Sequence, residues 1–276
     1  MRDHRGQFML IRFGYEISVN CAEDTPMNCL LDIRDEHRPQ LRSAEVVTTE
    51  PEVPMALHRD MFGNICRRLV VPAGDLTIRG DGVIEDPGHP DPEDLTAEEV
   101  PVARLPDETL PFLLGSRYCE TDRISQIAWD LFGGLAPGWG RVQAISDFAH
   151  RHIRFDYANA SSTRTAYEAW EDGTGVCRDF THLAIALCRA LNIPARYVNG
   201  YLGDIGVPPG GPMDFCAWME VYLGGRWHTF DPRNNQRRIG RITVARGRDA
   251  ADVALIHSFG PHTLTHFFVR CEELEG

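Results

Sequence analysis

The first third of the chain alternates apolar and polar residues in short runs. Turn-forming segments such as 23–26 and 35–39 separate these runs. Alternation over roughly four to eight residues is typical of half-buried β-strands, and several short strands at this spacing are typical of a sheet or sandwich. The pattern therefore predicts an all-β, sandwich-like domain over residues 1–85, with these apolar strand positions: Phe13, Tyr15, Ile17, Val19, Leu30, Leu31, Ile33, Leu69, Val70, Val71, Leu76 and Ile78.

The apolar spacing becomes helical after Thr121 and Asp122, which have the character of a helix cap. Two helices are expected from the apolar positions Ile124, Ile127, Ala128, Leu131 and Phe132, followed by Val142, Ile145, Phe148 and Ile153. From Pro194 onward the alternating pattern returns. It predicts strands over residues 195–201, 215–223, 226–230 and 263–271.

Between these two patterns lies an acidic, proline-rich stretch. Residues 81–110 contain ten carboxylates, five prolines and a single basic residue, Arg104, so this stretch carries most of the chain's net charge of −12. Such a composition is typical of a solvated tether. We therefore expect a linker over residues 86–105 and a second domain over residues 106–276.

Composition and charge exclude several classes of protein. With 43% hydrophobic and 25% charged residues over 276 positions, the chain is an ordinary globular protein and not a disordered one. Its negative charge repels phosphate and anionic lipid, so neither a nucleic acid nor a membrane is the expected partner. The N-terminal segment has no apolar stretch typical of a leader, and no window approaches the roughly 18 apolar residues of a membrane span, which favours the cytoplasm. Eight scattered cysteines form no CxxC or CxxH pair, so we expect reduced thiols, no metal site and no cofactor.

One of these cysteines, Cys177, opens a predicted helix. Gly173-Thr174-Gly175 leads directly into an apolar stripe that starts at Cys177 and continues through Phe180 and Ala184. In the first turn of a helix, free backbone N–H groups and the helix dipole stabilise a thiolate, the nucleophilic form of cysteine. The alternative is that Cys177 is one more apolar residue of the stripe.

A second feature is a hairpin, residues 214–232, with Gly224-Gly225 as its two-residue turn. This turn pairs residue 223 with 226, 220 with 229, 218 with 231 and 216 with 233. Positions 216, 218, 229 and 231 then share one face of the hairpin, and His228 lies on the other.

The joint order of these motifs resembles the bacterial transglutaminase-like superfamily over roughly residues 106–276. The matching motifs are Gly175-Val176-Cys177-Arg178-Asp179-Phe180, Ile193-Pro194-Ala195-Arg196-Tyr197, Ala217-Trp218-Met219-Glu220-Val221 and Trp227-His228-Thr229-Phe230-Asp231-Pro232. The N-terminal segment, with Asp60-Met61-Phe62-Gly63-Asn64, is similar to the β-domain that precedes the core in many bacterial members. The resemblance implies an α+β fold, in which a small all-β domain precedes a papain-like transglutaminase core of helices packed on an antiparallel sheet.

The resemblance also implies a catalytic triad. In the family the helix cysteine attacks a carboxamide, a histidine on the first hairpin strand takes its proton, and an aspartate on the second strand orients the imidazole. Cys177 and Asp231 match, but Cys216 occupies the histidine position. A thiol, with a pKa of ~8.5 against ~6.5 for histidine, is a poor base. His228 faces away from Asp231 unless a bulge intervenes, and His182 lies about 140° around the helix from Cys177.

Two aromatic residues, Tyr118 and Trp218, are candidates for binding substrate, although tryptophan at such a position is more often part of a core.

Three hypotheses follow from the sequence. The first is an enzyme that hydrolyses or transfers peptide or isopeptide bonds through a thioester on Cys177, with a peptide or protein substrate. The second is a catalytically silent relative that binds a peptide or a partner. The third is a redox- or metal-responsive module that uses Cys177 and Cys216.

Overall fold

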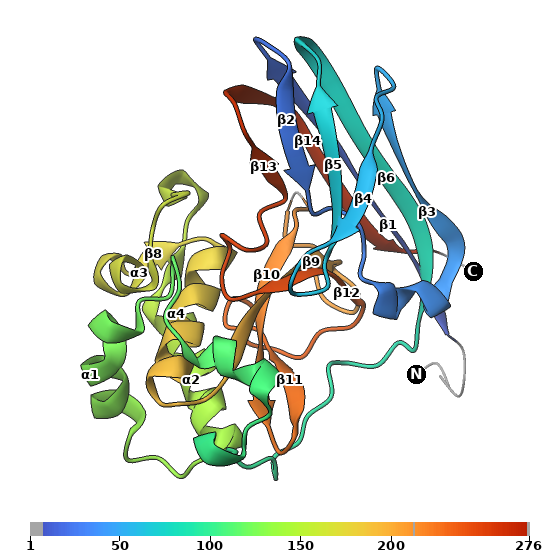
Figure 1. Cartoon of the computed structure of the whole chain (residues 1–276). Helices are drawn as coiled ribbons and strands as arrows, with labels where there is room; N and C mark the ends of the chain where they lie inside the picture. The colour runs from blue at the N-terminus through green and yellow to red at the C-terminus, as the bar shows by residue number, and fades with distance from the viewer. Residues whose placement is uncertain (1–7, 212, 275–276) are drawn as a thin grey trace.

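The computed structural model describes residues 8–211 and 213–274, and it divides into a β-domain and a mixed helix-and-sheet domain (Figure 1). The β-domain consists of two four-stranded antiparallel sheets, with strand orders β14-β1-β6-β3 and β13-β2-β5-β4. Their inward-facing apolar residues, such as Phe13 and Met27, belong to one buried cluster. The strands are β1 (Met9–Cys21), β2 (Thr25–Cys29), β3 (Leu41–Glu50), β4 (Ala56–Arg59), β5 (Ile65–Val71), β6 (Gly74–Asp86), β13 (Ile256–Ser258) and β14 (His262–Glu273).

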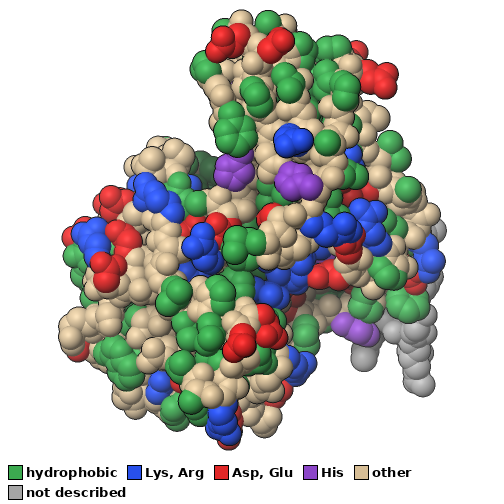
Figure 2. Space-filling model, viewed as in Figure 1, with side chains coloured by type: hydrophobic (Ala, Val, Ile, Leu, Met, Phe, Trp, Pro, Cys, Tyr) green, Lys and Arg blue, Asp and Glu red, His purple; other side chains and the backbone are tan. Residues whose placement is uncertain are grey.

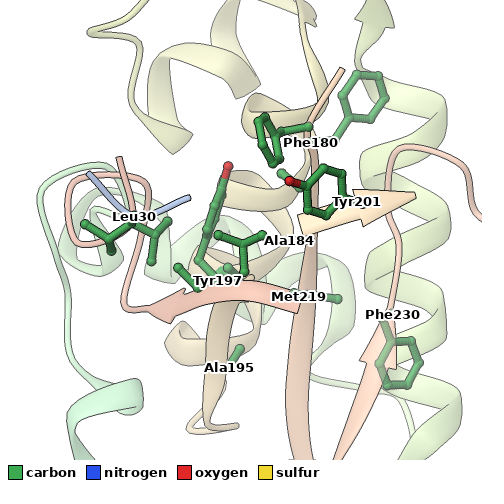
Figure 3. Close-up of a cluster of buried hydrophobic side chains, with 14 of the residues drawn as sticks. Leu30, Phe180, Ala184, Ala195, Tyr197, Tyr201, Met219 and Phe230 are labelled. Atoms are coloured by element: carbon green, nitrogen blue, oxygen red, sulfur yellow. The ribbon is translucent and has the colours of Figure 1, made fainter. Parts of the chain in front are cut away.

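The second domain packs four helices against a four-stranded antiparallel sheet of order β11-β10-β9-β12. Helix α4 lies in the middle, because it contacts the other three helices as well as β9 and β10. Its side chains are almost all buried, and Phe180 and Ala184 meet Tyr197 and Met219 of the sheet in the cluster that Figure 3 shows. The elements are α1 (Thr121–Phe132), α2 (Trp139–His152), α3 (Ala166–Asp172), α4 (Cys177–Ala190), β9 (Ala195–Leu202), β10 (Cys216–Leu223), β11 (Arg226–Phe230) and β12 (Arg241–Gly247).

This α+β architecture, with helices on an antiparallel sheet after an all-β domain, confirms the fold predicted from the sequence. The hairpin register is also confirmed, since Leu223 pairs with Arg226 and Glu220 with Thr229 across Gly224-Gly225. A short parallel pair, β7 (Arg154–Phe155) and β8 (Thr174–Gly175), leads the chain into α4. No helix in residues 8–211 and 213–274 is long and apolar enough to cross a membrane.

The C-terminal end of the chain departs from the predicted division into domains. Strand β13 pairs with β2, and β14 pairs along nearly its whole length with β1, from Ile11 opposite Glu273 to Cys21 opposite His262. The last two strands therefore complete the sheets of the β-domain, and they do not belong to the core that was expected over residues 106–276. An alternating pattern indicates that a segment is a strand, but it does not show which strand, some 250 residues away, pairs with it.

The acidic segment 86–105 is not a solvated tether. The backbone N–H of Asp91 donates to the carbonyl of Arg238 at 2.9 Å, and the carbonyl of Glu98 accepts the N–H of Gly224 at 2.8 Å. The carbonyl of Ala97 accepts the N–H of Trp139 at 2.9 Å. The segment is thus a strap that lies along the second domain, and its carboxylates are partly used there.

Polar contacts join the two domains. The buried side chain of Asn64 donates to the carbonyl of Arg246 at 2.7 Å and accepts the N–H of Arg246 at 2.8 Å. The backbone N–H of Thr243 donates to Nε2 of His37 at 2.8 Å. In the space-filling view, basic and acidic side chains are intermixed where the two domains meet (Figure 2). The Asp60–Asn64 turn recognised in the sequence is therefore part of the domain interface.

Candidate active site

Cys177 is the first residue of α4, as the sequence predicts. The helix start is fixed by Asp179, whose carboxylate accepts the backbone N–H of Val176 at 2.8 Å. Gly175 lies directly against the Asp179 side chain, where a β-carbon would collide. The run Gly175-Val176-Cys177-Arg178-Asp179 is therefore a helix cap that places the cysteine in the first turn.

The Cys177 thiol is half-buried and free. Burial raises its pKa to about 11; the backbone N–H groups of Ala217 and Arg178 contact the sulfur and lower the pKa, whereas the carboxylates of Asp214 and Asp231 raise it. The thiolate expected from the helix start alone is not favoured here, because burial outweighs the N–H groups. Cys177 is a protonated thiol at neutral pH.

Cys216 is brought to the same place. It is the first residue of β10, opposite Gly200 of β9, and its pKa is raised by burial and by the neighbouring Cys177 and Asp231. Its sulfur makes a long contact of 3.9 Å with the carbonyl of Asp214. The structure thus places the second cysteine beside the first, and both are free thiols.

Asp231 follows β11 and is buried. Its carboxylate accepts hydrogen bonds from Nη2 of Arg241 at 2.8 Å and from the backbone N–H and side-chain amide of Asn234, each at 2.9 Å. Arg241 also donates to Asp91 of the strap at 2.9 Å, and its guanidinium lies 4.9 Å from the centre of the Trp218 ring. Asp231 therefore orients a guanidinium, where the resemblance led us to expect an imidazole.

Neither candidate histidine joins these residues. His228 is buried on the opposite face of the hairpin, where Nε2 lies 3.2 Å from the carbonyl of Leu223 and the ring meets Trp139 edge-on. His182 is buried between Tyr118 and Tyr197, and its Nε2 accepts the N–H of Ala250 at 3.1 Å. Burial holds the pKa of His182 well below its usual value. In the part of the chain that the structure describes, the largest influences on the pKa of Cys177 and of Cys216 are burial and neighbouring groups that include no imidazole.

Comparison with known proteins agrees with this geometry. Residues 126–232, which include Cys177, Cys216 and Asp231, match the family model of the transglutaminase-like superfamily core. The chain is 35% identical over 220 residues to an uncharacterized protein of Mycobacterium tuberculosis (strain H37Rv), covering 71% of this chain and 68% of that protein. The chain belongs to the transglutaminase-like superfamily.

Two further relatives extend the likeness. An uncharacterized protein of Mycobacterium leprae is 26% identical over 218 residues, which cover 75% of this chain and 77% of that one. A crystal structure from Cytophaga hutchinsonii, described as "a Putative Cysteine Protease", superimposes with a TM-score of 0.84 at 29% identity and covers 98% of this chain and 92% of that one. The β-domain and the helix-and-sheet domain of this transglutaminase-like protein are therefore both present in that structure.

The two aromatic candidates have different environments in this transglutaminase-like protein. Trp218 is only 1% exposed and packs beneath Arg241, so it is part of the core and has no free surface for substrate. Tyr118 is half-buried beside the first turn of α4, where its hydroxyl donates to the carbonyl of Ser162 at 3.0 Å and the Arg178 guanidinium lies 4.9 Å from its ring. Tyr118 thus lies near Cys177, whereas Trp218 is a core residue that packs against Arg241.

Four residues of the site were not identified from the sequence, namely Asp214, Tyr157, Arg241 and Asp91. Asp214 and Tyr157 lie near the two thiols. The pKa of the Tyr157 phenol is raised first by burial and then by Asp214, Cys177 and Cys216. Tyr157 is 61% exposed, at the rim. Arg241 and Asp91 were missed because their pairing with each other joins segments 150 positions apart. Only Asp214 carried a usable signal, since it lies two residues before Cys216.

A polar cavity of about 280 Å³ adjoins Asp231 on the side of α2. The strap, α2 and the loop after β11 enclose it, and its polar lining includes Asp91, Glu93, Gln143, Ser146, Asn235 and Arg237. Most of these groups already bond to one another, as in the contact of the Ser146 hydroxyl with Asn235 at 3.1 Å. Among residues 8–211 and 213–274, no group of three or more His, Cys, Asp or Glu side chains is arranged to hold a metal ion.

Proposed function

We propose that this chain is a cysteine-nucleophile enzyme that acts on amide bonds through a covalent thioester on Cys177. It either hydrolyses a peptide or isopeptide bond or transfers the acyl group to an amine, and its substrate is a peptide or a protein. The observation that carries the proposal is the half-buried thiol in the first turn of α4, with the backbone N–H groups of Ala217 and Arg178 at its sulfur.

These backbone N–H groups can also stabilise the oxyanion that forms during the reaction. When the thiol attacks a carbonyl carbon, the carbonyl oxygen becomes an oxyanion within reach of the backbone donors around the nucleophile. The first N–H groups of a helix lack partners inside the helix, so they are free to bind such an oxygen. The helix start therefore supplies electrostatic stabilisation even though the ground-state thiol keeps its proton.

The raised pKa restricts the mechanism. A thiol with a pKa of about 11 is almost entirely protonated at neutral pH, so the enzyme has no stored thiolate. The proton must leave as the sulfur attacks, and a nearby group must accept it.

The second candidate is a catalytically silent relative that binds a peptide in the inherited cleft. It is favoured by one observation, namely that Asp231 is engaged by Arg241 and Asn234 in place of a histidine. Both candidates use the surroundings of Cys177 and differ in whether the thiol reacts. For either one we propose a reducing, cytoplasmic location, which the eight free cysteines support.

The Cys177→Ala variant separates these two candidates. We expect it to fold as the wild type does, because it removes one small sulfur from a helix start, and to lose all hydrolysis of labelled casein and all incorporation of a fluorescent amine into casein. Cys119→Ala, which removes a buried thiol bonded to the carbonyl of His182, is the matched control and should retain activity. Activity that survives in folded Cys177→Ala would exclude the nucleophile, and a wild type without either activity would favour the silent relative.

A further inference from the structure

One arginine beside the site differs from its neighbours in the segment that follows β11. Three arginines between residues 232 and 241 pair with carboxylates at 2.8 to 3.7 Å, namely Arg237, Arg238 and Arg241. Within the described part of the chain, Arg233 of the same segment has no carboxylate partner. Its guanidinium instead lies 4.1 Å from the centre of the Phe155 ring. The charge of Arg233 is therefore available to a ligand.

The backbone at Arg233 is held in a tight turn. The N–H of Asn235 donates to the carbonyl of Asp231 at 2.7 Å, and the N–H of Asn234 donates to the Asp231 carboxylate at 2.9 Å. Nδ1 of His150 lies 3.1 Å from the carbonyl of Arg233. Because the backbone is fixed and the guanidinium rests on a ring, binding an anion there costs little additional ordering.

The ring that contacts Arg233 packs beside the start of α4. Phe155 belongs to β7, whose partner β8 ends two residues before Cys177. The centre of the Phe155 ring lies 6.4 Å from that of Phe180, which is three positions after Cys177 and therefore on the same side of the helix. The exposed Tyr157 packs edge-on against Phe155, with ring centres at 4.9 Å. Arg233 and Tyr157 thus contact one ring beside the first turn of α4.

The loop after β7 is bonded to that same first turn. Arg178, the residue after Cys177, donates from Nη1 to the carbonyl of Ser162 at 3.0 Å. Burial raises the pKa of the Tyr157 phenol, and so do the neighbouring thiols, whereas Arg233 lowers it. This agrees with the packing, which places Tyr157 close to both the nucleophile and the guanidinium.

The charges around the sulfur make a cation necessary for an anionic substrate. Asp214 and Asp231 both raise the pKa of Cys177, so negative charge already acts on the sulfur. A negatively charged group of a substrate would be repelled there unless a cation faced it. A guanidinium matches a carboxylate through two parallel N–H donors. One unpaired guanidinium in a chain of net charge −12 suits a single carboxylate better than a polyanion.

We propose that Arg233 binds a carboxylate of the substrate next to the amide that Cys177 attacks, an inference that rests on the proposed function and names the charge that its substrate carries. The carboxylate belongs to an acidic side chain or to the free carboxyl end of a peptide, and both present the same pair of oxygens to the guanidinium. Arg233 is then a residue that determines specificity, and it takes no part in the chemistry at the sulfur.

The test compares two alkylating reagents of the same size, iodoacetate and iodoacetamide, on the full chain. The rate at Cys177 is followed by mass spectrometry, and the readout is the iodoacetate rate divided by the iodoacetamide rate. Arg233→Gln should lower this ratio by about three- to tenfold, the effect of one partly exposed charge pair. The ratio is insensitive to a change in the pKa of the thiol, because both reagents react with the same thiolate.

Two variants control the comparison. Arg233→Lys keeps the positive charge and should retain most of the wild-type ratio. Arg68→Gln, on the exposed side of β5, changes the net charge by the same amount and should leave the ratio unchanged. A wild-type ratio in folded Arg233→Gln, or a fall of equal size in Arg68→Gln, would overturn the assignment.

Blocked peptides distinguish the two sources of the carboxylate. One acetylated dipeptide carries a glutamate side chain and an amidated end, another is dialanine with a free carboxyl end, and dialanine amide is the neutral reference. The peptide with the matching carboxylate should slow iodoacetamide alkylation of wild-type Cys177 more than the reference does, and this protection should disappear in Arg233→Gln. Protection no greater than that of the reference by both peptides would contradict the proposal without any variant.

The outcomes separate this inference from the proposed function. If Cys177→Ala abolishes casein turnover while Arg233→Gln keeps the wild-type ratio, the enzyme stands and the carboxylate site is overturned. If the wild type turns over no casein but its ratio depends on Arg233, the carboxylate site stands in a catalytically silent relative.

Discussion

Two buried carboxylates of one hairpin, Glu220 and Asp231, are both paired with arginine, yet their surroundings differ. Glu220 accepts three hydrogen bonds from two arginines: one from Nε of Arg196, and one each from Nε and Nη2 of Arg246. Nη2 of Arg196 forms a further ion-pair contact with Glu220, and Arg246 is also bonded to Glu36 of the β-domain at 2.7 Å. Asp231 pairs with one arginine, Arg241. The thiols of Cys177 and Cys216 and the side chain of Asp214 lie nearby. The first carboxylate joins two domains in a closed cluster, whereas the second borders a site that still has reactive groups.

The difference shows how one sheet serves structure and chemistry. At Glu220 the charges satisfy one another, and although burial raises its pKa, the two arginines hold the pKa below its usual value. At Asp231 the pairing is incomplete, because Nη1 of Arg241 has no hydrogen-bond partner within the described residues. Incomplete satisfaction of buried polar groups is costly for stability and is common at functional sites.

The largest effect on stability is expected from Glu220→Gln. The change leaves the buried Arg196 with a neutral partner and Arg246 with Glu36 as its remaining carboxylate, which should lower the free energy of unfolding by about 3–5 kcal/mol. Urea denaturation measures it, and Arg226→Gln, which breaks the surface pair with Asp94, should leave the midpoint nearly unchanged. A loss no larger than that of the surface control would show that Glu220 does not join the domains.

A smaller effect is expected from Asp231→Asn, because Arg241 keeps its second carboxylate, Asp91. The variant should lose about 1–3 kcal/mol of stability, and Asp91→Asn is the matched single variant. In the double variant the buried guanidinium has no ionised partner, so the loss should exceed the sum of the two single losses. Additive losses in this double-mutant cycle would contradict the shared pairing.

Local features of the site were predictable from the sequence, whereas its long-range pairings were not. The Gly-Gly turn fixed the register around Glu220 and Thr229, and the apolar stripe after Gly175 placed Cys177 at a helix start. Both depend on residues within one turn or one hairpin, where spacing alone determines which side chains share a face.

The contacts that change the chemistry join distant segments. Asp91 of the strap is 150 positions from Arg241, and β14 returns to β1 across nearly the whole chain. The composition of residues 81–110 indicated a solvated tether because composition does not show which carboxylates find a partner. For the same reason, the motif around Asp231 did not reveal that an arginine of β12 would take the place of the histidine.

The central claim is that Cys177 is a protonated thiol and that neither His182 nor His228 reaches it. The most direct test is the pH profile of Cys177 alkylation in the wild type and in Cys216→His, with the other thiols counted separately by mass. The wild type should titrate near pH 11, and the imidazole of the variant should lower that value by drawing the thiol proton. A wild-type value below the ~6.5 of an ordinary histidine, with no shift in the folded variant, would contradict the account, because it would mean that another imidazole already serves Cys177.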